Sequence, residues 1–453
     1  MDIIKKRRYA AFSINENKYL CYNNVLKYMG YRKERRTELF MKKLKVGSLF
    51  AGVGGICLGF KQAQYNDLGY ELVWANEIDE HAATTYNNNF EHELIVGDIE
   101  KILDPNIIEN EKEEYIESMA NAKDNKERLS FRKLIEKCDL EKSVYEEKKR
   151  QILSHRIDVL NGGFPCQAFS IAGERKGFED HRGNLFWSII DLIKLLEPLH
   201  GKPRVLLLEN VKNLMSHDSG NTYKVIKNEL EKVGYTIKEK VLNTMNFSHL
   251  PQNRERIYIV GFLNKEEADR FTMFENINDY FISKTPNERI KDIKNIIDSS
   301  INKEENIKYY YTKDKYPSYF IEESQYLAIP EEERKSVRIN LVEDIVEENQ
   351  FYQVRRGMYV RKNMSNVCPT LTANMGTGGH NVPLIKVKDG IRKLTPKETF
   401  KLQGFPIGEG YEFPEKFNNR AYPESHLYKQ SGNAVSVPII KLIAEEILKA
   451  LKY

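Results

Sequence analysis

The sequence predicts an α/β fold in which a mostly parallel sheet carries helices on both faces and is joined to a smaller, irregular domain. Short apolar runs alternate with helical segments, a pattern typical of a parallel sheet that is covered on both faces. A glycine-rich turn follows the first run, and open α/β sheets bind their ligands at the carboxyl ends of the strands. We expect strands at residues 46–50, 72–74, 94–96, 158–160, 205–208 and 257–261.

Composition excludes several classes of protein. Of the 453 residues, 41% are hydrophobic and 30% are charged, so we expect two or three folded domains rather than disorder. The sequence has no run of about 18 apolar residues and begins with charged residues, so neither a membrane span nor a secretory signal is expected. Its five cysteines are far apart. This spacing argues against a disulfide framework and a Cys-x-x-Cys zinc site, and it predicts a cytoplasmic protein without a metal.

Changes in composition divide the chain into four parts. Residues 1–45 contain 13 Lys or Arg and 4 Asp or Glu, which fits either a solvated basic extension or a small helical unit that contacts DNA. Residues 46–262 carry the predicted strands of the sheet. Within them, residues 101–150 hold 12 basic and 13 acidic side chains and predict one or two exposed, inserted helices. Residues 263–427 predict a second domain with its hinge, and residues 428–453 a helical segment that returns to the first domain.

The turn Leu49–Gly55 predicts a site for a nucleoside cofactor. Its glycines allow a close approach of the backbone to a ligand, Glu77 at the end of the next strand could accept hydrogen bonds from a ribose, and Asp98 could receive an adenine amino group. Cys57 stands where a dinucleotide fingerprint has its third glycine, and Phe60 where a phosphate-binding loop has its lysine. The pattern therefore favours a nucleoside without a pyrophosphate, such as S-adenosylmethionine, over a purely structural turn.

Residues 162–170 predict an exposed nucleophile. This segment follows the strand at 158–160 and places Cys166 on a loop shaped by Gly162, Gly163 and Pro165. A thiol at the carboxyl end of a strand faces a cleft rather than the core, and it reacts as the thiolate.

Six motifs, in this order, resemble those of the DNA (cytosine-5)-methyltransferases. Residues 50–55 (FAGVGG), 165–167 (PCQ), 209–211 (ENV), 252–256 (QNRER), 392–406 (RKLTPKETFKLQGFP) and 430–438 (QSGNAVSVP) carry the resemblance. It spans residues 46–453 with interruptions. It implies a Rossmann-like catalytic domain that binds S-adenosylmethionine, and a target-recognition domain in residues 263–427.

The resemblance implies a catalytic role for four residues. Cys166 matches the nucleophile that adds to carbon 6 of cytosine, so that carbon 5 can attack a methyl sulfonium. Glu209 matches the group that stabilises or protonates N3. Arg256 matches a residue at the O2 edge of the base, and Arg254 one that orients its neighbours; positions two apart on a strand share a face. The sequence does not identify the base that removes the proton from carbon 5.

The resemblance also implies binding residues. Those expected around the cofactor are Phe50, Gly52, Gly54, Glu77, Ile78, Asp98, Ile99, Pro165, Leu185 and Asn433. Family members often have Trp at the position of Ile78, so an aromatic stack on adenine is not expected here. Those expected near the substrate are Gln167, Ser170, Arg182, Thr370 and Leu371, the last two in a segment, residues 367–380, that resembles the family's recognition segment.

The resemblance implies double-stranded DNA as the partner, with the target cytosine flipped out of the duplex. A bacterial restriction-modification system would add a cognate restriction endonuclease that acts on the same site without a stable complex, and the methylase is expected to be a monomer. Three alternatives remain open from the sequence. They are a related enzyme acting on RNA, a DNA-binding repressor that uses residues 1–45, and a nicotinamide-dependent oxidoreductase, which leaves the Pro-Cys-Gln motif and the paired arginines unexplained.

Overall fold

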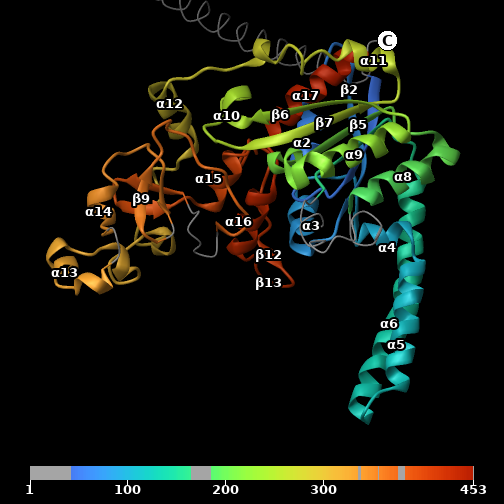
Figure 1. Cartoon of the computed structure of the whole chain (residues 1–453), viewed down its shortest axis with the longest axis horizontal. Coiled ribbons are helices and arrows are strands. Elements are labelled where there is room, and N and C mark those ends of the chain that lie inside the picture. The colour runs from blue at the N-terminus through green and yellow to red at the C-terminus, as the bar shows by residue number, and fades with distance from the viewer. Residues whose placement is uncertain (1–41, 165–184, 335–337, 356, 376–382, 452–453) are drawn as a thin grey trace, which may run out of the picture.

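A computed structural model describes residues 42–164, 185–334, 338–355, 357–375 and 383–451. Its centre is a seven-stranded sheet in the order β3-β2-β1-β4-β5-β7-β6, in which β7 alone runs against its neighbours (Figure 1). This arrangement confirms the predicted mostly parallel sheet. The strands are β1 (Lys42–Leu49), β2 (Leu68–Glu77), β3 (Glu93–Val96), β4 (Val159–Gly162), β5 (Val205–Val211), β6 (Thr236–Asn243) and β7 (Glu255–Phe262).

Helices cover both faces of this sheet, as predicted. Successive side chains of a strand point to opposite faces, and accordingly Leu207 packs against one layer of helices while Leu206 and Leu208 pack against the other. The first layer contains α2 (Gly55–Gln62), α11 (Lys265–Arg270) and α17 (Val437–Ala450). The second contains α4 (Ile99–Leu103), α8 (Leu185–His200) and α9 (Asn221–Lys232). Helix α3 (Glu80–Asn87) lies beside β2 and β3, and α10 (Thr244–Phe247) follows β6.

The first and last parts of the described chain share one core. In α17, Ile439, Ile440, Ile443 and Ile447 are fully buried and pack with residues of β1 and α2. Their spacing of three and four residues places them on one face of the helix. The sheet therefore gains part of its cover from the C-terminal end of the sequence.

Two helices between β3 and β4 form an arm that projects from the body (Figure 1). They are α5 (Asn106–Ala120) and α6 (Asn125–Ser154), which pack against each other. Few side chains of the arm are buried; they are Ile108, Cys138 and Ile152. Both helices fall on the charged insertion that the sequence predicts.

The second region contains a four-stranded antiparallel sheet that the sequence did not predict. Its order is β11-β10-β8-β9, from β8 (Tyr352–Arg355), β9 (Tyr359–Lys362), β10 (Leu384–Val387) and β11 (Gly390–Lys393). Short helices surround it: α12 (Pro286–Ile296), α13 (Glu323–Leu327), α14 (Leu341–Asp344) and α15 (Pro396–Lys401). A small hairpin, β12 (Lys416–Phe417) with β13 (Arg420–Ala421), then leads into α16 (Glu424–Asn433). Single 3-10 turns lie at Lys212–Met215, His217–Gly220, Ile277–Tyr280, Ile307–Tyr309, Pro317–Tyr319 and Glu331–Glu333.

A buried ion pair fastens the second region together. Arg392 on β11 donates to both carboxylate oxygens of Glu398 on α15, at 2.8 and 2.7 Å, and both side chains are almost fully buried. Glu398 also accepts hydrogen bonds from the backbone N–H groups of Thr395 and Asp298. One carboxylate therefore joins a strand, the start of a helix and the chain that follows α12.

We expect Glu398→Ala to lower the free energy of unfolding by about 3–5 kcal/mol, because it leaves the Arg392 charge buried without a counter-ion. Urea titration followed by circular dichroism measures this loss. Glu136→Ala on the arm is the matched control: its partner Arg132 lies 3.4 Å away and both side chains are exposed, so the loss should stay below about 0.5 kcal/mol. Equal losses for the two variants would contradict the role given to the buried pair.

Candidate active site

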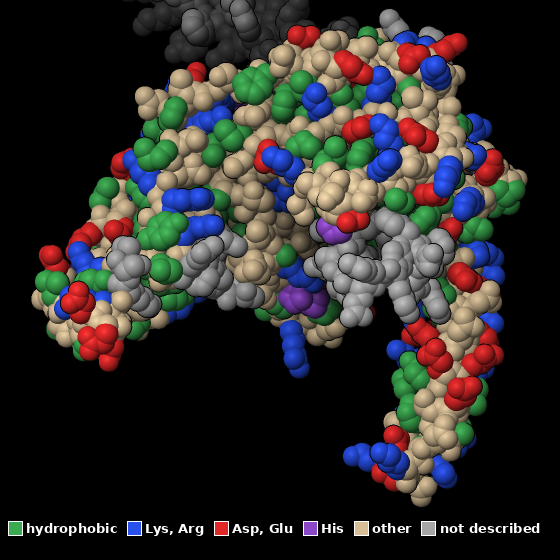
Figure 2. All heavy atoms as spheres, in the orientation of Figure 1, with side chains coloured by type: hydrophobic (Ala, Val, Ile, Leu, Met, Phe, Trp, Pro, Cys, Tyr) green, Lys and Arg blue, Asp and Glu red, His purple; other side chains and the backbone are tan. Residues whose placement is uncertain are grey.

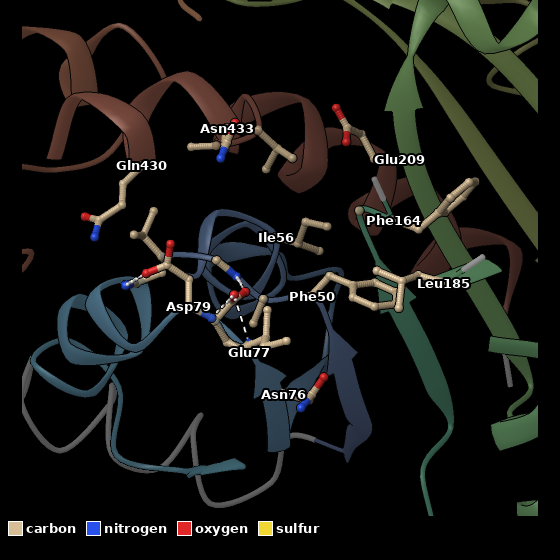
Figure 3. A pocket seen from close by; sticks show the side chains of 18 of the residues that line it. Phe50, Ile56, Asn76, Glu77, Asp79, Phe164, Leu185, Glu209, Gln430 and Asn433 are labelled. Atoms are coloured by element: carbon tan, nitrogen blue, oxygen red, sulfur yellow. Dashed lines mark hydrogen bonds between the residues drawn. The ribbon is translucent and has the colours of Figure 1, made fainter. Parts of the chain in front are cut away.

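A cavity of about 410 Å³ opens at the carboxyl ends of the parallel strands (Figure 3). The turn after β1, the ends of β2, β4 and β5, and the link from α16 to α17 line it. Its size falls within the range of small-molecule sites. Figure 3 shows Glu77 and Asp79 toward one end of the cavity and Glu209 toward the other.

Near its start, the turn after β1 adopts a left-handed backbone conformation at two residues, one of which is a glycine. Phe50 and Gly52 have positive φ angles of 54° and 56°, which are uncommon for residues other than glycine. The N–H of Gly52 donates to Glu77 at 2.7 Å. Gly54, also predicted to contact a cofactor, instead precedes α2 and is not among the residues that line the cavity.

Glu77 is fixed by backbone donors. Its carboxylate accepts from the N–H groups of Gly52, Ile78 and Asp79, at 2.7, 3.0 and 2.8 Å. Burial raises the pKa of Glu77, and these three hydrogen bonds partly offset the increase because they favour the charged form. The side chain is thereby held in one orientation at the edge of the cavity.

The same end of the cavity suits a nucleoside. Besides Glu77 it presents Asp79 and Asp98, whose side chains each cap the first turn of a helix. Among the described residues, the lining cations are Lys429, which pairs with Asp79 at 2.7 Å, and two arginines at the other end. Three carboxylates near the Gly52 turn would repel phosphates but can accept hydrogen bonds from ribose and amino groups. These residues fit the adenosine part of S-adenosylmethionine, which carries ribose hydroxyls and an amino group but no phosphate.

Glu209, the fifth residue of β5, is buried at the other end of the cavity. Burial raises the pKa of its carboxyl group, and the charges of Arg256 and Arg254 partly offset that increase. Arg256 Nε lies 3.1 Å from Glu209 Oε1, yet this oxygen has no hydrogen-bond partner in the described structure. A carboxyl group with a raised pKa in the lining of a cavity can give or share a proton there.

Arg254 is held by backbone carbonyls. Its guanidinium donates to Leu371 O at 3.1 Å, and to the carbonyls of Gly432 and Ala434 at 3.1 and 2.5 Å. Burial, and then the charge of Arg256, lower the pKa of Arg254 to about 9, so it stays protonated at neutral pH. Arg254 precedes β7 rather than lying within it, which corrects the expectation of a shared strand face. Both arginines nevertheless line the cavity.

The structure brings most predicted residues to one place. Lining the cavity are Phe50, Gly52, Glu77, Ile78, Asp98, Ile99, Leu185, Glu209, Arg254, Arg256 and Asn433. Thr370 and Leu371 do not line the cavity. Thr370 donates a hydrogen bond to Asn253 O at 2.6 Å, and the carbonyl of Leu371 accepts one from Arg254. Pro165, Cys166, Gln167, Ser170 and Arg182 lie outside the described residues.

Sequence reasoning missed some lining residues. Asp79 and Lys429 pair across the cavity rim, but neither a carboxylate two residues beyond Glu77 nor a lysine before a motif is distinctive alone. Asn210 was noted only as part of a motif, although its side chain donates to Phe164 O at 2.9 Å. This bond holds Phe164, the last described residue before the segment that contains Cys166.

Comparison with known proteins identifies the family. The family model for C-5 cytosine-specific DNA methylase matches residues 44–116 and 111–449. The chain belongs to this family. It is therefore a DNA (cytosine-5-)-methyltransferase, as the order of motifs predicted.

Two relatives are similar over most of their length. The chain is 42% identical over 409 residues to the type II methyltransferase M.Bsp6I of Bacillus sp. (strain RFL6), covering 90% of this chain and 99% of that one. It is 32% identical over 411 residues to M.HaeII of Haemophilus aegyptius, covering 91% and 95%.

Solved structures share the fold. A methyltransferase of Entamoeba histolytica has a TM-score of 0.54 at 18% identity, with 91% of this chain and all of that one covered. The Dnmt2 methyltransferase of S. pombe has a TM-score of 0.51 at the same identity, with the same coverage.

An aromatic stack lies beside Asp79, which lines the cavity. His81 on α3 and His426 on α16 stack with their centroids 3.5 Å apart and their planes 7° from parallel, and Phe417 covers the other face of His81 at 3.8 Å. Asp79 offers a carboxylate oxygen within 4.8 Å of both imidazoles, a set of atoms that could hold a metal ion. Its oxygens already cap α3 and bind Lys429, so the group joins α3 to α16 without needing an ion.

We expect this stack to weaken in acid. Burial and the neighbouring His81 lower the pKa of His426 in the folded protein, so the unfolded chain binds more protons as the pH falls below about 6.5. Stability should therefore fall as the pH decreases from 7 to 5. Urea titrations across this range test the effect.

His426→Phe keeps a flat ring in the stack and should remove this part of the pH dependence. The exposed His249 supplies the control, because His249→Phe should leave it unchanged. An undiminished pH dependence in His426→Phe would show that the histidine stack is not its source.

Proposed function

We propose that this enzyme transfers a methyl group from S-adenosylmethionine to carbon 5 of one cytosine in a specific short site of duplex DNA. One observation carries the proposal. Glu209, with its raised pKa, lies beside Arg256 at one end of a cavity whose other end suits a nucleoside. The described chain borders this cavity at Phe164, two residues before Cys166.

The chemistry follows from the order of bonds made and broken. The Cys166 thiolate would add to carbon 6, which moves electron density onto N3, where Glu209 would supply or share a proton. Arg256 would bind the O2 edge and stabilise the same developing charge. S-adenosylmethionine, when bound, supplies the electrophilic methyl group that carbon 5 attacks. Loss of the carbon 5 proton to a base would then expel the Cys166 sulfur and restore the ring.

The cofactor would bind at the carboxylate end of the cavity. We propose that Glu77 accepts hydrogen bonds from the ribose, that Asp98 receives the adenine amino group, and that Ile78 and Ile99 pack on the ring. Phe50, Gly52, Leu185, Asn433 and the loop residue Pro165 would enclose the remainder. Gly54 would act through the shape of the turn, because it does not line the cavity.

DNA would enter opposite the cofactor. We propose residues 46–262 as the catalytic domain, residues 263–427 as the target-recognition domain with its hinge, and residues 428–453 as the segment that completes the cavity. Extruding a base costs on the order of a few kcal/mol, which contacts from a second domain can offset. Gln167, Ser170 and Arg182 would contact the flipped nucleotide, while Thr370 and Leu371 would act by positioning Arg254 and its neighbours.

The named relatives suggest a biological role. Both are type II methyltransferases, so we propose that this enzyme protects DNA from a restriction endonuclease that recognises the same site without forming a stable complex. A monomer acting in the cytoplasm would suffice for this role. None of the helices in the described part of the chain combines the length and the apolar character needed to cross a bilayer.

Transfer of label from S-adenosylmethionine to mixed-sequence duplex DNA tests the proposal. We expect 5-methylcytosine from the wild type and none from Cys166→Ala, because the alanine cannot add to carbon 6. Cys138→Ala, which alters a cysteine on the arm, should retain transfer. Mapping the labelled cytosines would define the site. Equal transfer by Cys166→Ala would contradict the mechanism. If RNA offered in parallel were labelled and DNA were not, RNA would replace DNA as the substrate.

Glu209→Gln should lower kcat by roughly 10²–10⁴-fold, because the amide cannot supply a proton to N3. Binding of S-adenosylmethionine should be unaffected, since Glu209 lies at the opposite end of the cavity. Single-turnover methyl transfer and calorimetry measure the two effects. Glu239→Gln, on β6 and paired with Lys227, is the control and should stay within about twofold of the wild type. A Glu209→Gln enzyme with normal kcat would remove Glu209 from the mechanism.

A further inference from the structure

The arm formed by α5 and α6 is firmly attached to the body. Near its base, Lys149 donates to Leu103 O at 2.6 Å, and the ring nitrogen of His200 lies 2.9 Å from Leu153 O. Further out, Lys142 pairs with Glu109 at 2.8 Å across the two helices. The 15 residues of α5 extend about 22 Å. The arm therefore holds its outer turn at a defined place, well away from the sheet.

Charge is distributed unevenly along the arm. Helix α5 contains 5 Glu and 1 Lys, and residues 134–154 contain equal numbers of acidic and basic side chains. The outer end, residues 123–133, contains 5 basic and 2 acidic residues. We call these residues the arm tip. The positive charge of the arm is thus concentrated at the tip.

The two acidic side chains of the tip accept hydrogen bonds from the backbone of the tip itself. Asp124 accepts a hydrogen bond from the N–H of Glu127 at 2.8 Å, and Glu127 accepts one from the N–H of Lys123 at 2.8 Å. These bonds shape the turn between the helices. They also keep both carboxylates close to the backbone.

The basic side chains of the tip remain available. Lys123, Lys126, Arg128 and Lys133 are exposed, and within the described residues none of them lies in an ion pair with a carboxylate. Arg132 has one exposed partner, Glu136, at 3.4 Å. Cations that serve no internal contact are suited to an external anion.

Under the proposed function, the arm extends from the body beside the face at which a duplex would reach the cavity. Figure 1 shows the arm extending downward on one side of the body, while the region around β9 and α13 extends outward on the other side. Figure 2 shows the surface between them as a hollow, flanked by these two projections. A duplex that reaches the cavity would continue past the arm on one side.

We infer that the arm tip binds the phosphate backbone of duplex DNA outside the recognition site. The inference rests on the proposed function and adds a contact surface to it. Lysine and arginine side chains that neutralise phosphates release condensed counterions, so each contact increases both the affinity and its dependence on salt. The acidic residues of α5 would repel the duplex from the shaft, which confines the contact to the tip.

The test compares two duplexes that carry the mapped site, with flanks of about 4 and about 20 base pairs, and follows binding by fluorescence anisotropy across a salt series. The variant is Lys126→Glu with Lys133→Glu. Its matched control is Lys43→Glu with Lys265→Glu, two exposed lysines on β1 and α11. Either pair of substitutions lowers the net charge from +4 to zero.

The wild type should bind the long duplex about five- to tenfold more tightly than the short one near 0.1 M salt, with a salt slope steeper by about two, the effect of two phosphate contacts. The tip variant should lose this advantage and the control variant should keep it. A tip variant that retains the full advantage, or equal losses in both variants, would overturn the inference. A change in the molar mass of the protein in solution on substitution would also overturn the inference, because it would indicate that the arm tip binds a second copy of the chain. Methylation of the short duplex by the wild type tests the proposed function separately.

Discussion

Burial of the Arg254 guanidinium is the constraint on which the rest of the site depends. A buried cation is costly unless its donors find acceptors, and here the two terminal nitrogens of the guanidinium donate to the carbonyls of Leu371, Gly432 and Ala434. These carbonyls come from the segment between β9 and β10 and from the end of α16 with its link to α17. The packing around them is close, because a Cβ atom at Gly432 would lie 2.2 Å from the carbonyl carbon of Thr372. One side chain thus fixes the relative position of three segments that are far apart in the sequence.

The charged side chains of the resulting cavity are separated between its two ends. Carboxylates that accept hydrogen bonds from backbone N–H groups, some of them in the first turns of helices, occupy the end near Gly52. Glu209 and two arginines occupy the other end. A ligand with cationic character and a base that develops negative charge would each find a complementary end. Because the backbone and not flexible side chains holds Glu77 and Arg254, little reorganisation is needed when either ligand binds.

Much of this could be predicted from the sequence, for identifiable reasons. Continuous apolar runs such as 205–208 identify buried strands because both faces are covered, and motifs report site residues because chemistry restricts the residue types. The strand β6 and the sheet β8–β11 were missed, since strands such as Tyr359–Lys362 have weakly buried, mixed sequences that resemble loops. The partners of Arg254 could not be predicted, because backbone carbonyls leave no signal in the sequence. The stack of His81 and His426 depends on tertiary packing between residues that are far apart in the sequence.

The packing of α17 against β1 and α2 has a consequence for biosynthesis. A ribosome that adds roughly 5–20 residues per second releases β1 tens of seconds before the isoleucines that cover its face. Until then the nascent sheet lacks the part of its core that α17 supplies, and the cavity lacks the wall supplied by Asn433 and Val435. A chain whose translation stops early would therefore contain Cys166 and Glu209 without an assembled site. Assembly of the cavity therefore depends on α17 and the link before it, although the strands that form most of the cavity are made much earlier.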